Sequence, residues 1–100
     1  MELTISSIRC VLQVALLGAV TPNLRAVIVE TEKDEMTLYF YYDEKFSEEE
    51  EENAEVVATE VMTDFLDHVV NLKHIVLPYP EKLPEIGIRV FQRYEAYFQE

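Results

Sequence analysis

The chain has 100 residues, 49% of them hydrophobic, and a formal net charge of −12. This length and apolar content suit one domain with its own core, which we expect to span residues 1–100. The negative charge excludes a protein that binds nucleic acid through its phosphate backbone, and the lone Cys10 excludes an internal disulfide.

The amino-terminal segment predicts a helix, because apolar side chains recur at helical spacing over residues 3–17 and Gly18 suits the helix end. Residues 10–20 resemble the apolar part of a signal peptide, but Gln13 interrupts them and they are too short to span a bilayer. We therefore expect no membrane segment and a cytoplasmic location. Cys10 is expected to pack as a small apolar side chain.

A hairpin is predicted next, because residues 25–31 and 36–42 are rich in Val, Ile, Tyr and Phe and are joined by a polar turn. Side chains of a strand alternate between the two faces of its sheet. The side chains of the second strand thus form two sets. One set is Leu38, Phe40 and Tyr42, and the other is Tyr39 and Tyr41. We expect one set to meet the helices and the two tyrosines to form a surface.

The central segment predicts a second helix over residues 47–68. Ser47 followed by Glu50 matches a capping box, in which each side chain binds the backbone amide of the other residue. The acids that follow Ser47 also suit the positive end of a helix dipole. Apolar residues at helical spacing then mark the side expected to be buried, and they are Ala54, Val57, Ala58, Val61, Phe65 and Val69.

Residues 72–77 and 86–94 predict the last two strands, separated by a proline-containing loop. The expected order of elements is therefore α-β-β-α-β-β. Such an order is typical of an α+β domain, here with a mostly antiparallel four-stranded sheet and two helices packed on one face.

Most of the negative charge lies in one segment. Between Asp43 and Asp67 the chain has eleven acids and the single base Lys45. Like charges four residues apart on a helix repel each other, and a face that serves only solubility more often mixes both signs. We interpret the outward face of the second helix as a surface for a basic partner, and a purely solvated face stays the alternative. Its predicted residues are Glu49, Glu52, Val56, Thr59, Glu60, Thr63 and Asp67.

Metal binding and catalysis find little support in the sequence. Carboxylates along one straight helix diverge, and no calcium-loop motif is present, so we predict no metal and no cofactor. His68 and His74 are expected at a helix end and in the core. The chain has neither a nucleophile elbow nor a phosphate-binding loop, and we do not expect an enzyme.

Three stretches carry a resemblance to a known family: ALLGAVTPNLRAVIVE (15–30), LYFYYDEKFSEEEEENAEVVATEVMTDF (38–65) and LPYPEKLP (77–84). Together they resemble small bacterial immunity proteins of the contact-dependent growth inhibition (CdiI-like) type. The resemblance implies a protein that binds the toxic domain of a cognate effector, often a nuclease, and blocks it in the producing cell. It brings no catalytic motif, so the binding site must come from the charge pattern.

We therefore expect a cognate toxin domain as the partner, bound through the acidic helix and the segment that leads into it. The predicted contact residues are Asp43, Glu44, Glu49, Glu52, Val56, Glu60 and Asp67, with Tyr39 and Tyr41 as further candidates. The alternative is a small acidic chaperone or adaptor for a secreted effector, which would form a homodimer through its apolar first helix.

Overall fold

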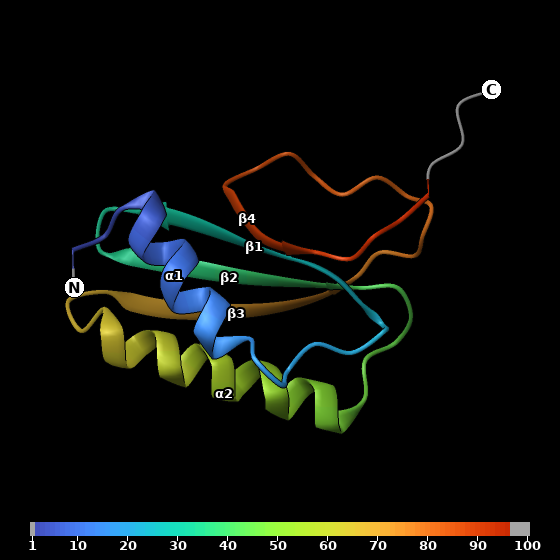
Figure 1. Cartoon of the computed structure of the whole chain (residues 1–100), viewed down its shortest axis with the longest axis horizontal. Helices are drawn as coiled ribbons and strands as arrows, with labels where there is room; N and C mark the ends of the chain where they lie inside the picture. The colour runs from blue at the N-terminus through green and yellow to red at the C-terminus, as the bar shows by residue number, and fades with distance from the viewer. Residues whose placement is uncertain (1, 97–100) are drawn as a thin grey trace.

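Two helices and four strands follow one another in the predicted α-β-β-α-β-β order (Figure 1). The computed structural model describes residues 2–96. Within that range the elements are α1 (Ile5–Ala15), β1 (Leu24–Glu32), β2 (Glu35–Tyr42), α2 (Glu48–Asp64), β3 (Val69–Val76) and β4 (Ile88–Gln92). The predicted α+β class is confirmed. Neither of the two helices is both long enough and apolar enough to cross a membrane.

The four strands form one mixed sheet in the order β3-β2-β1-β4. β1 pairs antiparallel with β2 and with β4, whereas β2 and β3 are parallel. Parallel neighbours need a long connection, because the chain must return to the same end of the sheet. α2 makes that connection and runs alongside β3 (Figure 1).

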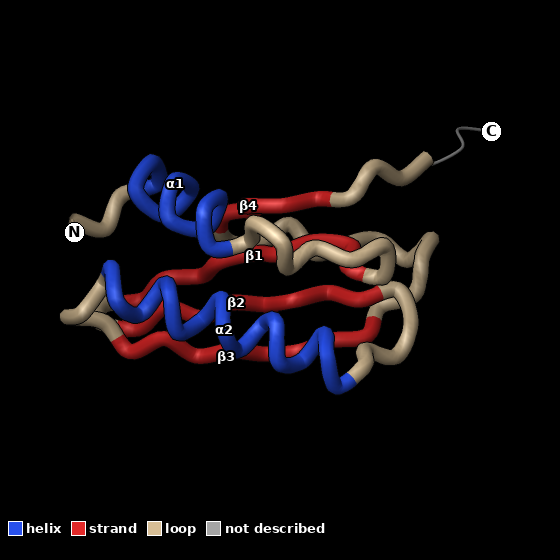
Figure 2. Tube along the Cα trace, turned by 60° about the horizontal axis from the view of Figure 1, so that its bottom comes forward, coloured by secondary structure: helices blue, strands red, loops and turns tan. Residues whose placement is uncertain are grey.

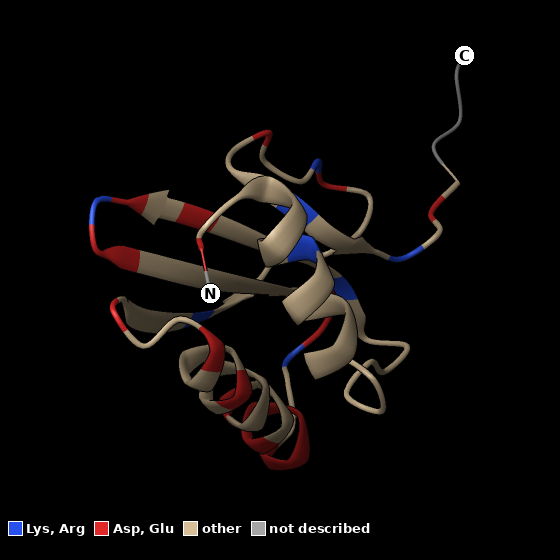
Figure 3. Ribbon diagram, turned by 60° about the vertical axis from the view of Figure 1, so that its left-hand side comes forward, with Lys and Arg blue, Asp and Glu red and all other residues tan. Residues whose placement is uncertain are grey.

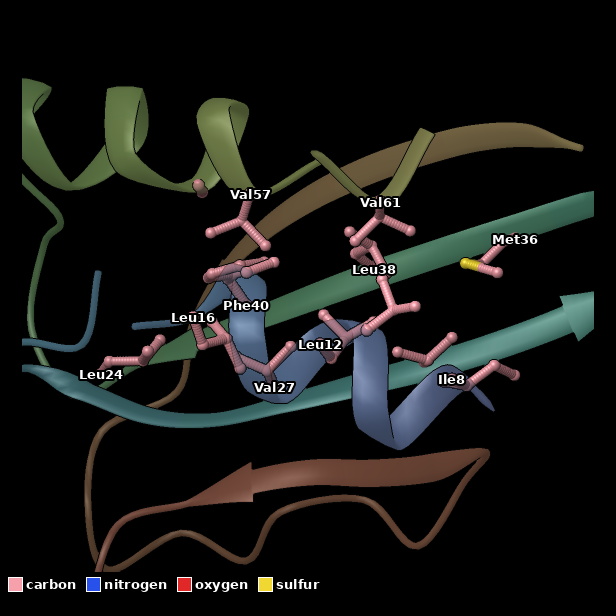
Figure 4. Close-up of a cluster of buried hydrophobic side chains, with 14 of the residues drawn as sticks. Ile8, Leu12, Leu16, Leu24, Val27, Met36, Leu38, Phe40, Val57 and Val61 are labelled. Atoms are coloured by element: carbon pink, nitrogen blue, oxygen red, sulfur yellow. The ribbon is translucent and has the colours of Figure 1, made fainter. Parts of the chain in front are cut away.

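Both helices cover the same face of the sheet, as predicted (Figure 2). Between them and the sheet lies the main core, to which α1 contributes Ile8 and Leu12 and α2 contributes Val57 and Val61 (Figure 4). The predicted inward set of β2 is also there, since Leu38, Phe40 and Tyr42 belong to this core.

The opposite face of the sheet is partly covered by the loop between β3 and β4. Leu83 of this loop packs against Ala26, Ile28 and Tyr41, with the partly buried Leu77 beside them. Only 4% of Tyr41 is exposed. The expected surface role of Tyr41 is therefore wrong, because the proline-containing loop folds back over this strand.

α2 ends four residues earlier than predicted, at Asp64, and Phe65 is its capping residue. The amide of His68 donates to the carbonyl of Phe65 in a turn, and the amide of Val69 donates to the carbonyl of Asp34 at 2.7 Å. Val69 thereby begins β3 beside β2, and it is 59% exposed rather than buried. Strand pairing ends the helix here, overriding the apolar periodicity that continues through the sequence.

Candidate partner-binding surface

The predicted acidic side chains of α2 lie at the surface. Glu49, Glu52 and Glu60 are exposed, as is Glu44 in the segment before the helix, and Val56 is 58% exposed among them. Figure 3 shows the acidic positions following one another along α2, while the basic positions lie on other elements. We call the set Glu44, Glu49, Glu52, Val56, Glu60 and Asp67 the acidic surface.

Asp67 belongs to this surface from a different element than predicted. It is exposed, but it lies in the turn after Phe65 and not on the helix. The acidic surface therefore extends past the carboxyl end of α2 toward β3.

The acids of α2 have no bases to pair with on their own helix. From Glu48 to Asp64 the chain contains eight acids and no lysine or arginine. The salt bridges found within residues 2–96 join Arg25 and Arg93 to Asp43 and Glu95, and none involves α2. No basic side chain of the helix therefore offsets the repulsion between its outward carboxylates.

Glu50 differs from its neighbours, because it holds the start of α2 in place. Its carboxylate accepts the amide of Ser47 at 3.0 Å, and the hydroxyl of Ser47 accepts the amide of Glu50 at 3.1 Å, so the predicted capping box is confirmed. The same carboxylate also accepts the Thr21 hydroxyl and the Asn23 amide. Burial would raise the pKa of Glu50, but these hydrogen bonds outweigh it and lower that pKa below its usual value.

Asp43 is half-buried and already has partners within the fold. One of its oxygens accepts the amide of Tyr79 at 2.8 Å, and the other lies 3.2 Å from the guanidinium of Arg93. The amide of Tyr79 first, and then Arg93, lower the pKa of Asp43 although burial opposes them. Asp43 thus ties the end of β2 to the segments on either side of β4, and we leave it out of the acidic surface.

The cluster around Asp43 includes a buried ion pair that the sequence did not indicate. Arg25 is completely buried and forms two hydrogen bonds with the carboxylate of Glu95, at 2.7 and 2.9 Å. Arg25 also donates to the carbonyl of Leu77, at 2.6 Å. Because the two partners are 70 residues apart, neither spacing nor periodicity links them.

The tyrosines of β2 do not extend the acidic surface. Tyr39 alternates with the core residues Leu38 and Phe40, so it points to the face of the sheet that the helices leave uncovered. Its hydroxyl donates to Glu30 at 2.8 Å, and this hydrogen bond, with burial, raises its pKa. Tyr39 could contact a partner only from the side of the sheet opposite α2.

Both histidines pack against aromatic rings. His74 stacks on Phe46 with ring centroids 5.0 Å apart, and His68 packs edge-on against Phe65. No group of three or more His, Cys, Asp or Glu side chains within residues 2–96 is placed to hold a metal ion.

A groove lies between the two helices, beside the acidic surface. It has a volume of about 280 Å³ and is lined by Cys10, Val11, Val14, Ala15, Glu60 and Asp64. Cys10 was expected to pack as a small apolar side chain, but it is exposed. It lines the groove together with Val11 and Val14 of the same helix. We call this feature the α1–α2 groove.

The structure is thus a small α+β domain that carries exposed acidic side chains along α2. The family model of the MafI2 immunity protein matches residues 5–95, and the chain belongs to this family. None of the curated proteins matches the chain. The expected class of immunity protein is thereby confirmed, with a cognate toxin as its partner. The matching family belongs to a toxin system distinct from contact-dependent growth inhibition.

Proposed function

We propose that this immunity protein neutralises a basic toxin domain, of the nuclease type, by binding it in the cytoplasm through the acidic surface. The observation that supports the proposal is the row of exposed, unpaired carboxylates along α2. A face that must only stay soluble gains nothing from the repulsion between these carboxylates. When such a face binds a basic partner, the opposite charges of the partner relieve that repulsion.

The charge pattern favours a nuclease among the possible toxins. A nuclease needs a basic groove that attracts phosphates, and a row of carboxylates offers the same sign of charge to that groove. Complementary fields also steer two proteins toward each other, with association rate constants on the order of 10⁸ to 10⁹ M⁻¹s⁻¹ at low salt. Rapid capture suits an inhibitor that must act before its toxin reaches a substrate.

Within the acidic surface the residues have different roles. Glu49, Glu52 and Glu60 supply the charge along the helix, while Glu44 and Asp67 extend it at the two ends. Val56 provides an apolar contact among them, where water can be excluded on binding. No catalytic step is assigned, because inhibition by binding needs only occupancy of the toxin.

The test uses the toxic domain of the cognate effector. Coexpression with the immunity protein should restore growth, and the purified proteins should form a complex. The variant Glu49→Lys/Glu52→Lys/Glu60→Lys should lower the association rate constant by roughly tenfold or more at low salt. Undiminished toxicity during coexpression would contradict the proposed function.

A matched control separates the effect of the acidic surface on binding from the effect of net charge. Glu32, Glu35 and Glu81 are also exposed but lie on the hairpin and the β3–β4 loop. Changing these three to lysine alters the net charge equally, and binding should stay close to that of the unmodified protein. Equal losses in both variants would overturn the assignment to α2. Competition between the complex and a short DNA duplex then checks whether the toxin surface is one that binds nucleic acid.

A further inference from the structure

The α1–α2 groove has two chemically different walls. Val11 and Ala15 of α1 are buried and form its apolar base, and Val14 is 65% exposed at the rim. Glu60 and Asp64 of α2 form the other wall. A purely apolar ligand would leave the two carboxylates of this wall without a partner. A purely polar ligand would leave the apolar base without a contact.

The two carboxylates of the groove are available to a ligand. Neither Glu60 nor Asp64 takes part in any salt bridge found within residues 2–96. Residues four apart on a helix are neighbours, about 5 to 6 Å between their Cβ atoms, so both carboxylates can approach the same cation. Arg9, the only base of α1, is not among the residues that line the groove.

We propose that the α1–α2 groove receives an arginine side chain of the toxin, with its aliphatic stem on Val11 and Val14 and its guanidinium between Glu60 and Asp64. The inference rests on the proposed function and adds a specific pocket to the acidic surface. Arginine fits best, because it joins an apolar stem to a planar, permanently charged head with five donors. That head can bond two carboxylates at once, which an ammonium does less well.

Cys10 makes the groove directly testable, because it lines the groove and is the only cysteine of the chain. In the complex with the toxin domain, alkylation of Cys10 by iodoacetamide should be at least about tenfold slower than in the free protein. An unchanged rate in an intact complex would overturn the groove and leave the acidic surface standing. Failure to form any complex would instead count against the proposed function.

Paired substitutions locate the charge that matters. Glu60→Gln/Asp64→Asn should weaken toxin binding by roughly tenfold or more. Both changes remove acids from the carboxyl-terminal half of α2, where the helix dipole disfavours them, so the fold should be retained. The control Glu48→Gln/Glu55→Gln removes the same charge from exposed positions of the same helix that do not line the groove. Equal weakening by both pairs would overturn the proposal.

A third measurement needs no toxin. Cys10 of the free protein should react faster with a cationic methanethiosulfonate reagent than with an anionic one, because Glu60 and Asp64 attract the former. This preference should fall in Glu60→Gln/Asp64→Asn and persist in Glu48→Gln/Glu55→Gln. A preference that is the same in all three proteins would contradict the predicted cation-binding wall.

A second copy of this chain is the competing occupant of the groove. If it occupied the groove, Cys10 would react more slowly as the protein concentration rises, and the mass in solution would be that of a dimer. We expect a rate independent of protein concentration and a monomer mass. A dimer with protected Cys10 would overturn the proposal and favour the homodimer considered from the sequence.

Discussion

Carboxylates occur in two environments in this molecule, one with basic partners and one without. Asp43 and Glu95 lie near the end of the sheet and are held by Arg25 and Arg93, with distances of 2.7 to 3.2 Å. Glu49, Glu52 and Glu60 lie exposed on α2, where no base accompanies them. Residues of one chemical type therefore serve the fold in one region and face solvent in the other.

The difference shows how the few bases of the chain are used. Of its eight lysines and arginines, two are placed in the cluster that ties the carboxyl-terminal segment to β1 and β2. None is placed on α2, where an exposed lysine would relieve repulsion at little cost. The paired group therefore contributes to stability, whereas the role that we propose for the unpaired group is to bind a partner.

The largest effect on stability is expected in the paired group. Arg25→Met removes the main partner of Glu95, whose side chain is 1% exposed, and should lower the free energy of unfolding by about 3 to 5 kcal/mol. Urea unfolding measures this loss. Arg25→Met/Glu95→Met should recover part of it, since no unpaired charge then remains buried. A loss below about 1 kcal/mol for the single variant would mean that this ion pair does not hold the segment.

Glu50 is intermediate between the two groups, and we predict that its contribution to stability depends on pH. Its pKa is lowered in the fold from the ordinary 4.5, so the charged form stabilises the protein above that pH. The stabilisation is lost as the pH falls through the lowered pKa. Glu50→Gln should cost about 1 to 2 kcal/mol near neutral pH, and this difference should shrink in acid. A difference that is constant from neutral to acidic pH would show that the carboxylate charge contributes nothing.

Ser47→Ala tests the cap of α2 without changing any charge. The variant leaves the amide of Glu50 without its acceptor and should cost about 1 kcal/mol of stability. Ser47→Asp should restore most of this, because aspartate also caps helices. If Ser47→Ala cost no stability, the hydroxyl would have no role at the helix start. Affinity for the toxin should change little in either, since Ser47 is not part of the acidic surface.

The smallest effect on stability, of opposite sign, is expected on the acidic surface. Glu52→Gln removes a like charge four residues from Glu48 and should stabilise the fold by about 0.2 to 0.5 kcal/mol at low salt. The same variant should weaken toxin binding. A gain in stability together with a loss of binding would sharpen the contrast between the two groups, whereas a loss of stability would show that Glu52 serves the fold.

The elements of the fold could largely be predicted, because they depend on local patterns. Ser47 and Glu50 mark the start of α2 through contacts three residues apart, and the alternation of Leu38, Phe40 and Tyr42 identifies the buried face of β2. The end of α2 could not be predicted in this way. Pairing of Val69 with the hairpin decides it, and that pairing joins residues 34 positions apart.

The candidate site follows the same division. Exposure of Glu49, Glu52 and Glu60 follows from helical periodicity alone, and the structure places them as expected. The groove was missed because Cys10 and Val14 come from the other helix, and no local signal shows how two helices pack. Tyr41 was misjudged because the loop that covers it lies about 40 residues further along the chain.

The sequence by itself determined the class of fold, the cap at the start of α2, the faces of the central strand and the acidic character of α2, since each depends on residues a few positions apart. Only the tertiary structure decided the strand order, the parallel pairing of β2 with β3, the buried Arg25–Glu95 pair and the α1–α2 groove. These features join segments distant in the chain, and their energies come from burial and pairing that arise only when those segments meet.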